Sequence, residues 1–277
     1  MHQFAVIIAI GLTACSMSQP LFADSTHHNT HETKKVLQMQ AGALKTILID
    51  VGAGQLSVVG SDSNHIKVEA TIVGDNLIAD NYQLTLEEKA GKVELYAHIK
   101  GNKHDDERID LVVSLPASMA LDVRDRSGDI DISVMSGGLT IFDRSGDITL
   151  THISGATNID DRSGDIWVDG LTGPLQVNDR SGEIWLKHIA GNGNIVDRSG
   201  DIFVKHLTGD LRIEDSSGDI TVKKITGLVS VDDSSGNINI KAAGDFILLS
   251  DGSGDVTVGN LGKPLNNSSH VDAKTRK

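Results

Sequence analysis

The sequence is poor in cysteine, proline and aromatic residues. Of its 277 residues, 1 is cysteine, 4 are proline, and aromatic residues make up 3%. The single cysteine, Cys15, excludes an intrachain disulfide, and the shortage of aromatic residues means that a core must be built from isoleucine, leucine and valine. Glycine is common, at 29 residues, and glycine without proline is typical of a regular structure with many tight turns.

Basic residues are outnumbered by acidic ones, which gives the chain a formal net charge of −13 at pH 7. Because nucleic-acid binding requires a basic face, this charge argues against a general nucleic-acid binder. Long hydrophobic runs are missing as well: beyond residue 23, no segment is apolar over the length that a membrane-spanning helix needs. Contact with a membrane is therefore expected only through a lipid anchor.

The N-terminus has the pattern of a targeting segment. Residues 4–14 form an apolar run that is too short to span a bilayer and has the length of a signal-peptide core. Two processing routes remain open: Leu12-Thr13-Ala14-Cys15 resembles a lipobox in which Cys15 would be lipidated, and residues 21–23 would suit cleavage before Asp24. Residues 1–23 are predicted to be a signal segment, and the protein to be exported to the periplasm, the outer membrane or the cell surface.

A strictly periodic repeat dominates the rest of the chain. The segment Asp125-Arg126-Ser127-Gly128-Asp129-Ile130 recurs with small changes, and its glycine returns without a slip at positions 128, 146, 164, 182, 200, 218, 236 and 254. When each coil is counted from its turn serine as position 1, positions 4, 6 and 9 are apolar in every copy, and positions 13 and 15 form a second apolar pair. This alternation is strand periodicity. One coil cannot bury its own apolar face, but stacked coils can, through parallel pairing about 4.8 Å apart.

These patterns predict an all-β protein, a parallel β-helix or β-solenoid with 18-residue coils. Residues 125–262 are expected to form the regular solenoid, and residues 45–124 irregular first coils that cap its end. Within that region, residues 54–58 look like a degenerate copy of the repeat. Residues 24–44, which are polar and rich in histidine, are expected to form a linker, and residues 263–277 a polar tail.

The repeated Ser-Gly-Asp-Ile resembles a bacterial putative-adhesin family of unknown function. The resemblance covers about residues 45–262 and includes Leu115-Pro116 followed by Leu121-Asp122-Val123, which leads into the first full repeat. It implies a single-stranded, right-handed β-helix at the cell envelope. It brings no established catalytic residues, so none are assigned.

The acidic residues are arranged in a way that argues against catalysis. They recur at the same position of every coil, whereas an active site needs one local constellation whose groups are driven to different pKa values. Turn geometry explains the repeats better, because Asp and Ser side chains hydrogen-bond the backbone of tight turns. The sequence favours a non-catalytic envelope scaffold that binds an envelope polysaccharide or a surface protein; a self-assembling envelope filament and a polysaccharide-acting β-helix enzyme remain the alternatives.

One outward-facing strip of the solenoid is a candidate binding surface. If positions 4 and 6 point inward, positions 5 and 7 must point outward. Position 5 is aromatic in three consecutive coils, as Trp167, Trp185 and Phe203, and position 7 alongside is basic in four coils, as Lys187, Lys205, Lys223 and Lys241. Exposed aromatic residues in a row often mark an interaction site, and the lysines would favour an anionic partner. The alternative is that the stacked rings only stabilise neighbouring strands.

The turns carry a column of carboxylates. Position 17 is Asp in all eight copies, and position 18 is Arg in the first five. Stacked carboxylates would repel one another, so the arginines are expected to bridge and neutralise them. After Arg198 the arginines stop while the acids continue, which makes the oxygens of Asp215, Asp219, Asp233 and Asp251 a candidate calcium site. The alternative is that these acids are simply solvated, and no other cofactor is predicted.

Overall fold

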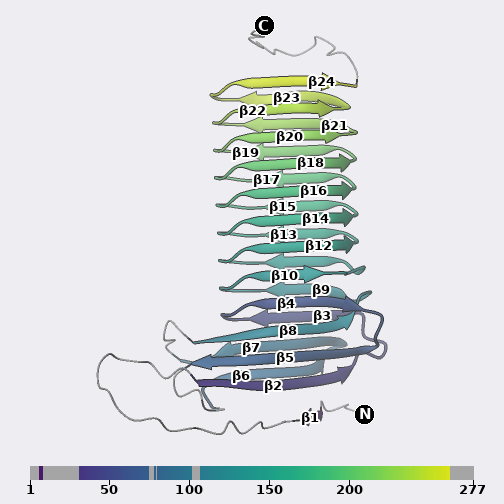
Figure 1. Cartoon of the computed structure of the whole chain (residues 1–277), viewed down its shortest axis with the longest axis vertical. Coiled ribbons are helices and arrows are strands. Elements are labelled where there is room, and N and C mark those ends of the chain that lie inside the picture. The colour runs from purple at the N-terminus through teal and green to yellow at the C-terminus, as the bar shows by residue number, and fades with distance from the viewer. Residues whose placement is uncertain (1–5, 9–30, 75–77, 79, 102–106, 263–277) are drawn as a thin grey trace, which may run out of the picture.

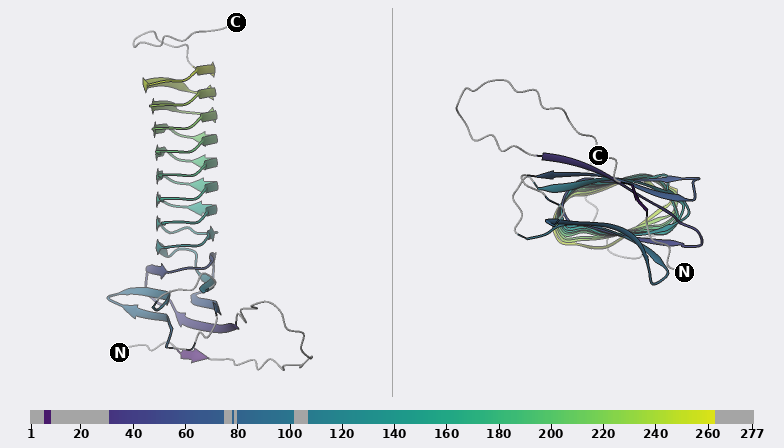
Figure 2. Two further views of the ribbon diagram at one scale, coloured as in Figure 1. Left: turned by 90° about the vertical axis from the view of Figure 1, so that its left-hand side faces the viewer. Right: turned by 90° about the horizontal axis from the view of Figure 1, so that it is seen from below.

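The computed structural model describes residues 6–8, 31–74, 78, 80–101 and 107–262, which form 24 strands and no helix. The strands stack into one rod, with the purple N-terminal strands at one end and the yellow C-terminal strands at the other (Figure 1). Two sheets face each other across the rod, as the view along its axis shows (Figure 2). The predicted all-β parallel solenoid is thus confirmed, and the described residues include no helix that could cross a membrane.

Each regular coil contributes one strand to each sheet. The first sheet carries β10 (Ile130–Ser133), β12 (Ile148–Ser154), β14 (Ile166–Thr172), β16 (Ile184–Ala190), β18 (Ile202–Thr208), β20 (Ile220–Ile225), β22 (Ile238–Ala243) and β24 (Val256–Leu261). The second sheet carries β9 (Ala120–Arg124), β11 (Leu139–Phe142), β13 (Thr157–Asp160), β15 (Leu175–Asn178), β17 (Gly193–Val196), β19 (Leu211–Asp215), β21 (Leu228–Asp233) and β23 (Asp245–Asp251).

These strands pair in parallel at a constant offset of one full coil. Ile166, for example, lies opposite Ile148 on one side and opposite Ile184 on the other. The offset changes only near the C-terminus, where a bulge between Val231 and Asp232 shifts the pairing of β21 with β23. Equal positions of successive coils therefore form straight columns along the rod.

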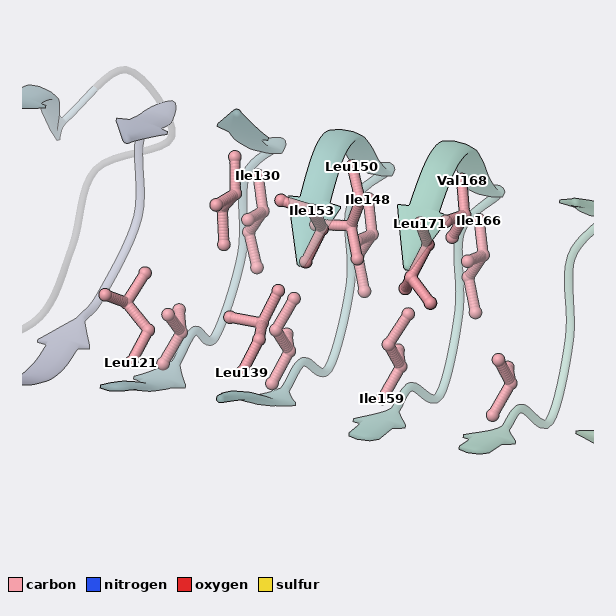
Figure 3. Packing of buried hydrophobic residues seen from close by; sticks show 14 of the residues in the cluster. Leu121, Ile130, Leu139, Ile148, Leu150, Ile153, Ile159, Ile166, Val168 and Leu171 are labelled. Carbon is pink, nitrogen blue, oxygen red and sulfur yellow. The ribbon is translucent and has the colours of Figure 1, made fainter. Parts of the chain in front are cut away.

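The core consists of aliphatic columns. In one coil, the side chains of Ile166, Val168, Leu171, Leu175 and Val177 are no more than 2% exposed. Figure 3 shows the columns in neighbouring coils, with the side chains pointing into the space between the two sheets. Each such side chain stabilises the fold by roughly 1.5–3 kcal/mol relative to an exposed one. Aromatic residues enter the core only near the ends of the described rod, as Tyr82 and Phe246.

The aspartate at position 17 holds the turn before the strands β10 to β20 of the first sheet. Oδ1 of Asp161 accepts hydrogen bonds from the backbone N–H of Arg162 (2.6 Å) and of Ser163 (3.2 Å). The same pair of bonds forms at Asp125, Asp143, Asp179, Asp197 and Asp215. The aspartate at position 3 links coils instead, since Oδ1 of Asp147 accepts the N–H of Asp165 at 2.9 Å. The turn role predicted for these repeated residues is confirmed.

The N-terminal region begins with a complete coil. Strands β3 (Thr46–Val51) and β4 (Leu56–Ser61) pair in parallel with β9 and β10, although residues 62–119 lie between β4 and β9 in the sequence. Leu56 lies opposite Ile130, as an equivalent position of the repeat should. Residues 54–58 are therefore a copy of the repeat, as predicted.

Antiparallel strands close this end of the rod. β7 (Lys92–Ile99) pairs in parallel with β3 and antiparallel with β6 (Tyr82–Lys89), and β8 (Arg108–Pro116) pairs in parallel with β4 and antiparallel with β5 (His65–Gly74). The strand β2 (His31–Gln40) then covers β5, and β1 (Val6–Ile8) pairs with β2. The solenoid thus ends in strands whose direction does not continue the parallel stack.

The prediction of a linker over residues 24–44 is wrong for His31–Gln40, which form β2. Leu37 of this strand is only 4% exposed, and the ammonium group of Lys35 lies 4.8 Å from the ring centre of Tyr82. The strand is amphipathic, but the polar residues of its exposed face outnumber the apolar ones. The alternation of apolar and polar residues that predicts a strand is therefore hard to see in the sequence of these ten residues.

Two predictions for the chain ends concern residues that the structure does not describe. Cys15, the candidate lipidation site, and the tail over residues 263–277 both lie outside the described residues. The same holds for the signal segment over residues 1–23, apart from residues 6–8. These assignments remain predictions from the sequence.

The glycine at position 2 of each coil is the point of closest approach between coils. Gly182 has a φ of +150°, and a Cβ atom there would overlap the carbonyl oxygen of Gly164 in the preceding coil. We expect Gly182→Ala to lower the free energy of unfolding by more than about 2 kcal/mol, because it adds a steric overlap with backbone to a conformation that alanine rarely adopts.

Gly138→Ala is the matched control for this substitution, measured by urea denaturation. The nearest atom to a Cβ at Gly138 is the carbonyl oxygen of Ala156, at 3.7 Å. We expect a change within about 0.5 kcal/mol. Equal destabilisation by both substitutions would contradict the close approach at position 2.

Candidate ligand-binding surface

The predicted strip of aromatic and basic residues lies on the outer face of the first sheet. We call it the aromatic–lysine surface; its members are Trp167, Trp185, Phe203, Lys187, Lys205, Lys223 and Lys241. They belong to β14, β16, β18, β20 and β22, where they alternate with buried core residues. The structure therefore brings all seven residues to one face, as the alternation predicts.

The three aromatic rings form a continuous stack across three coils. The ring centres of Trp167 and Trp185 are 4.9 Å apart with planes 5° apart, and those of Trp185 and Phe203 are 4.0 Å apart at 19°. Trp167 is 40% exposed and stands at one end of the stack, while the other two rings are half-buried. The stack thus presents a flat aromatic face to solvent at its Trp167 end.

The lysines form a second column beside the rings. Lys187, Lys205 and Lys223 lie opposite one another in the parallel pairing. The ammonium group of Lys187 is 5.5 Å from the Trp167 ring centre and 5.8 Å from that of Trp185, within the range of a cation–π contact. Cationic groups and flat apolar rings therefore occupy one continuous surface.

Glu183 supports this surface, and the sequence alone did not single it out. At position 3 most coils carry an Asp whose carboxylate accepts an N–H from the next coil, whereas Glu183 directs its Oε2 to Nε1 of Trp185 at 2.9 Å. The longer side chain reaches the indole and fixes the orientation of the ring. Glu183 stands where most coils carry Asp, in the coil of Trp185, and this difference in the sequence could have identified the residue.

The residue at position 8 lies beside the lysines in an unusual backbone conformation. His188 and His206 have φ values of 53° and 59°, and their rings stack with centres 5.1 Å apart. Nδ1 of His188 is 2.7 Å from Oδ1 of Asp169. Desolvation lowers the pKa of His206, and the neighbouring charge of Lys224 lowers it further. The His206 imidazole therefore adds little positive charge to this face at neutral pH.

The aspartates at position 17 form a buried column on the other side of the turn. Asp161 is fully buried, and its Oδ2 has no hydrogen-bond partner among the described residues; the same is true of Oδ2 in Asp143, Asp179, Asp197, Asp215 and Asp233. Burial raises the pKa of Asp161 to about 7, that of Asp197 to about 6 and that of Asp215 to about 7, and repulsion between neighbouring carboxylates adds to the rise.

The expected bridging of these aspartates by arginines is not what the structure shows. Arg144, Arg162, Arg180 and Arg198 are exposed, and among the described residues no ion pair joins them to the column from Asp143 to Asp233. The carboxylates point inward to hold the turn, so the guanidinium groups that follow them point outward. The repulsion within the column contributes instead to the raised pKa values of Asp161, Asp197 and Asp215.

The four aspartates proposed to bind calcium do not share one site. Asp215 and Asp233 belong to the buried column, whereas Oδ1 of Asp219 accepts hydrogen bonds from the backbone and side chain of Asn237 on the outside of the turn. Asp251 lies at the C-terminal end of the column, in β23. In the ranges that the structure describes, no three His, Cys, Asp or Glu side chains are grouped so that they could hold a metal ion.

The buried carboxylates make stability depend on pH. Their pKa values in the folded state lie above the value of 3.8 for an exposed aspartate, so the folded state holds protons that the unfolded state has lost. This contribution is complete below pH 4 and is lost as the pH rises to about 7. We expect a higher melting temperature at pH 5 than at pH 8. Asp161 alone should make the free energy of unfolding about 2–3 kcal/mol larger at pH 5 than at pH 8.

Asp161→Asn tests the origin of this dependence, because the amide keeps Oδ1 for the turn and cannot ionise. We expect the variant to show a smaller loss of melting temperature between pH 5 and pH 8 than the wild-type chain. An equal loss in the two proteins would mean that other groups cause the dependence.

The fold and surface define a class of protein before any comparison is made. The chain is a β-solenoid repeat protein. Its parallel coils carry the same polar residues in their turns, whereas the residues on their outer faces differ from coil to coil. This chain belongs to the Toastrack DUF4097 family, whose model matches residues 44–277. The resemblance predicted from the repeat is thereby confirmed.

Solved structures with a similar fold include several described as adhesins. A putative adhesin from Parabacteroides merdae ATCC 43184 has a TM-score of 0.52 and 13% sequence identity, and the match covers 86% of this chain and 100% of that one. A putative adhesin from Parabacteroides distasonis ATCC 8503 has a TM-score of 0.45 and 17% identity, and the match covers 83% of this chain and 97% of that one. A putative lipid-binding protein from the same organism has a TM-score of 0.43 and 14% identity, and the match covers 82% of this chain and 94% of that one. A comparison with curated proteins found no match. At these identities the likeness concerns the fold alone.

Proposed function

We propose that this protein is a non-catalytic, exported scaffold of the cell envelope that binds an acidic polysaccharide in the manner of an adhesin. The observation that carries the proposal is the continuous stack of Trp167, Trp185 and Phe203 beside a column of lysines. A sugar ring can pack its apolar face against the exposed indole, and the ammonium groups can pair with carboxylate or sulfate groups of the same polymer.

The geometry of the surface suits a polymer. The lysines are repeated along the solenoid axis at the spacing of the coils, about 4.8 Å. A chain of sugars that stacks one ring on Trp167 and continues along the axis can therefore pair its anionic groups with several lysines. Each contact is weak, and binding several in one chain raises the overall affinity. The similarly folded protein from Parabacteroides merdae is described as a putative adhesin, which agrees with a role at a surface.

The same chemistry argues against an enzyme. The carboxylates with raised pKa values are buried at equivalent positions of successive coils, where Asp161, Asp197 and Asp215 cannot reach a substrate. A general acid needs both a suitable pKa and access to the reacting group. A polysaccharide-acting enzyme is therefore the weaker candidate.

The double substitution Trp167→Ala with Trp185→Ala tests the proposal. We expect at least a tenfold loss of affinity for acidic oligosaccharides prepared from a bacterial envelope, measured by isothermal titration calorimetry, because the sugar loses its stacking face. In the wild-type chain, binding should also change the tryptophan fluorescence, since the only two tryptophans of the sequence lie in this surface.

Thr149→Ala with Thr221→Ala is the matched control, because these residues occupy the same column directly before and after the aromatic stack. We expect this variant to bind as the wild-type chain does. Full binding by the tryptophan variant, with an unchanged melting curve, would show that the stack is not the site. Binding of an envelope protein and of no polysaccharide would assign the surface to a protein partner.

Self-association is a second candidate, favoured by the C-terminal end of the rod. Among the described strands, β24 and β23 are the last of their sheets, and Ile247 and Leu249 of β23 are 40% and 48% exposed. The N-terminal end is closed by antiparallel strands, so the C-terminal edge has no matching edge on which a filament could grow. Two C-terminal edges can pair with each other, which would give a closed dimer.

Light scattering coupled to size-exclusion chromatography distinguishes these outcomes. We expect the mature chain to pass from monomer to dimer as its concentration rises from micromolar to millimolar, with no larger species. Oligomers that continue to grow with concentration would support a filament, and a monomer throughout would exclude self-association at this edge.

A further inference from the structure

A column of arginines runs along the turn edge of the solenoid, and we call it the arginine column: Arg126, Arg144, Arg162, Arg180 and Arg198. All five side chains are exposed. None of their guanidinium groups forms a hydrogen bond or an ion pair with another residue in the described part of the chain. Among the described residues, these five like charges in successive coils are therefore without a bound counter-charge.

The turn itself does not require arginine. In the coil where Ser216 replaces it, Oδ1 of Asp215 accepts the backbone N–H of Ser216 at 2.6 Å and of Ser217 at 3.2 Å. The corresponding distances at Asp197 are also 2.6 Å and 3.2 Å, where Arg198 follows. Serine and arginine therefore give the same turn, and the reason for five arginines in succession must lie outside the turn.

A groove lies alongside the arginine column. It has a volume of about 360 Å³ and is lined by Arg126, Arg144, Arg162 and Arg180, with Arg124 and Phe142. Five arginines face four carboxylates in this lining. Two of the carboxylates, Asp125 and Asp143, are buried in the turns, where burial raises the pKa of Asp143, and Oδ1 of Asp50 lies 2.6 Å from Nε2 of His98. Asp160 is the remaining carboxylate of the lining. Positive charge thus predominates in a groove of an otherwise acidic protein.

This groove is separate from the aromatic–lysine surface. Arg124, Phe142 and Asp160 face outward from β9, β11 and β13 of the second sheet, whereas Trp167 and Lys187 face outward from the first. The two surfaces therefore lie on different faces of the rod, and both run parallel to its axis.

We propose that the arginine column and its groove form a second binding surface, which takes a linear acidic polysaccharide laid along the rod. A guanidinium group binds a carboxylate or a sulfate through two parallel N–H···O hydrogen bonds. The arginine column offers one guanidinium group in each coil. A polymer with one acidic group on each sugar offers its anions in a single row, as the arginines offer their cations.

Duplex nucleic acid fits this surface less well. A duplex carries a dense charge on a broad cylinder and needs a wide basic face, whereas this column is one residue wide and the chain has a net charge of −13. The narrow, straight row of cations favours a narrow polymer.

Polygalacturonate is the probe that tests the proposal, with neutral dextran as the reference polymer. We expect the full-length chain to bind polygalacturonate and not dextran, with an affinity that falls as salt concentration rises. In a Trp167→Ala, Trp185→Ala background, which removes the aromatic face of the other surface, the triple variant Arg144→Ser, Arg162→Ser, Arg180→Ser should bind at least tenfold more weakly than the background chain. Its melting temperature should be unchanged, because the chain itself carries serine at residues 216 and 234 of this column.

Lys45→Ser, Lys67→Ser, Lys92→Ser is the matched control, since it removes three exposed positive charges from the N-terminal end of the rod. We expect its affinity to change by less than twofold. Ser216→Arg with Ser234→Arg extends the arginine column by two coils, and we expect it to bind at least threefold more tightly. This gain of binding tests the proposal even if the loss variant is less stable.

The other results would overturn the proposal. Equal weakening by the arginine and lysine triple variants would show general electrostatic attraction. Tighter binding of duplex DNA than of polygalacturonate, lost with the same arginines, would assign the column to nucleic acid. Loss of polygalacturonate binding in the Trp167→Ala, Trp185→Ala variant but not in the arginine variant would place the polymer on the aromatic–lysine surface alone.

Discussion

The contact between successive turns at position 2 is the constraint on which the rest of the structure depends. The backbone N–H of Gly164 donates to the carbonyl oxygen of Ser181 at 3.1 Å, and a Cβ atom on Gly182 would overlap the carbonyl oxygen of Gly164. Coils that approach this closely can differ little in length or path. A repeat of constant length, without insertions, is the sequence expression of that contact, and it aligns the strands of the regular solenoid up to the bulge between Val231 and Asp232.

A constant register converts substitutions in successive coils into surfaces. Trp167, Trp185 and Phe203 stack because each occupies position 5 of its coil, and the lysines and arginines form columns for the same reason. Such a protein can acquire a binding surface by changing one position in a few neighbouring coils, while the core and turns stay as they are. Both surfaces described above therefore run along the axis and suit extended polymers.

The same register has an energetic cost at position 17. Stacking places a buried carboxylate in every turn, and burial together with the neighbouring carboxylates raises the pKa of Asp161 to about 7. The aspartates from Asp125 to Asp215 are tolerated because the Oδ1 of each satisfies two backbone N–H groups that the tight turn leaves without partners. The turn is thus made at the expense of stability at neutral and alkaline pH.

The sequence by itself determined the periodic part of this protein. Alternation along residues 125–262 shows which side chains point inward and which outward, and a period without slips fixes the columns, so the core and the aromatic–lysine surface were predictable residue by residue. Only the tertiary structure placed β2, because His31–Gln40 belong to no repeat and their partner β5 is chosen by packing. It also decided the direction of turn side chains, which alternation does not govern: Asp161 turns inward to bind the backbone, which leaves Arg162 free to face solvent.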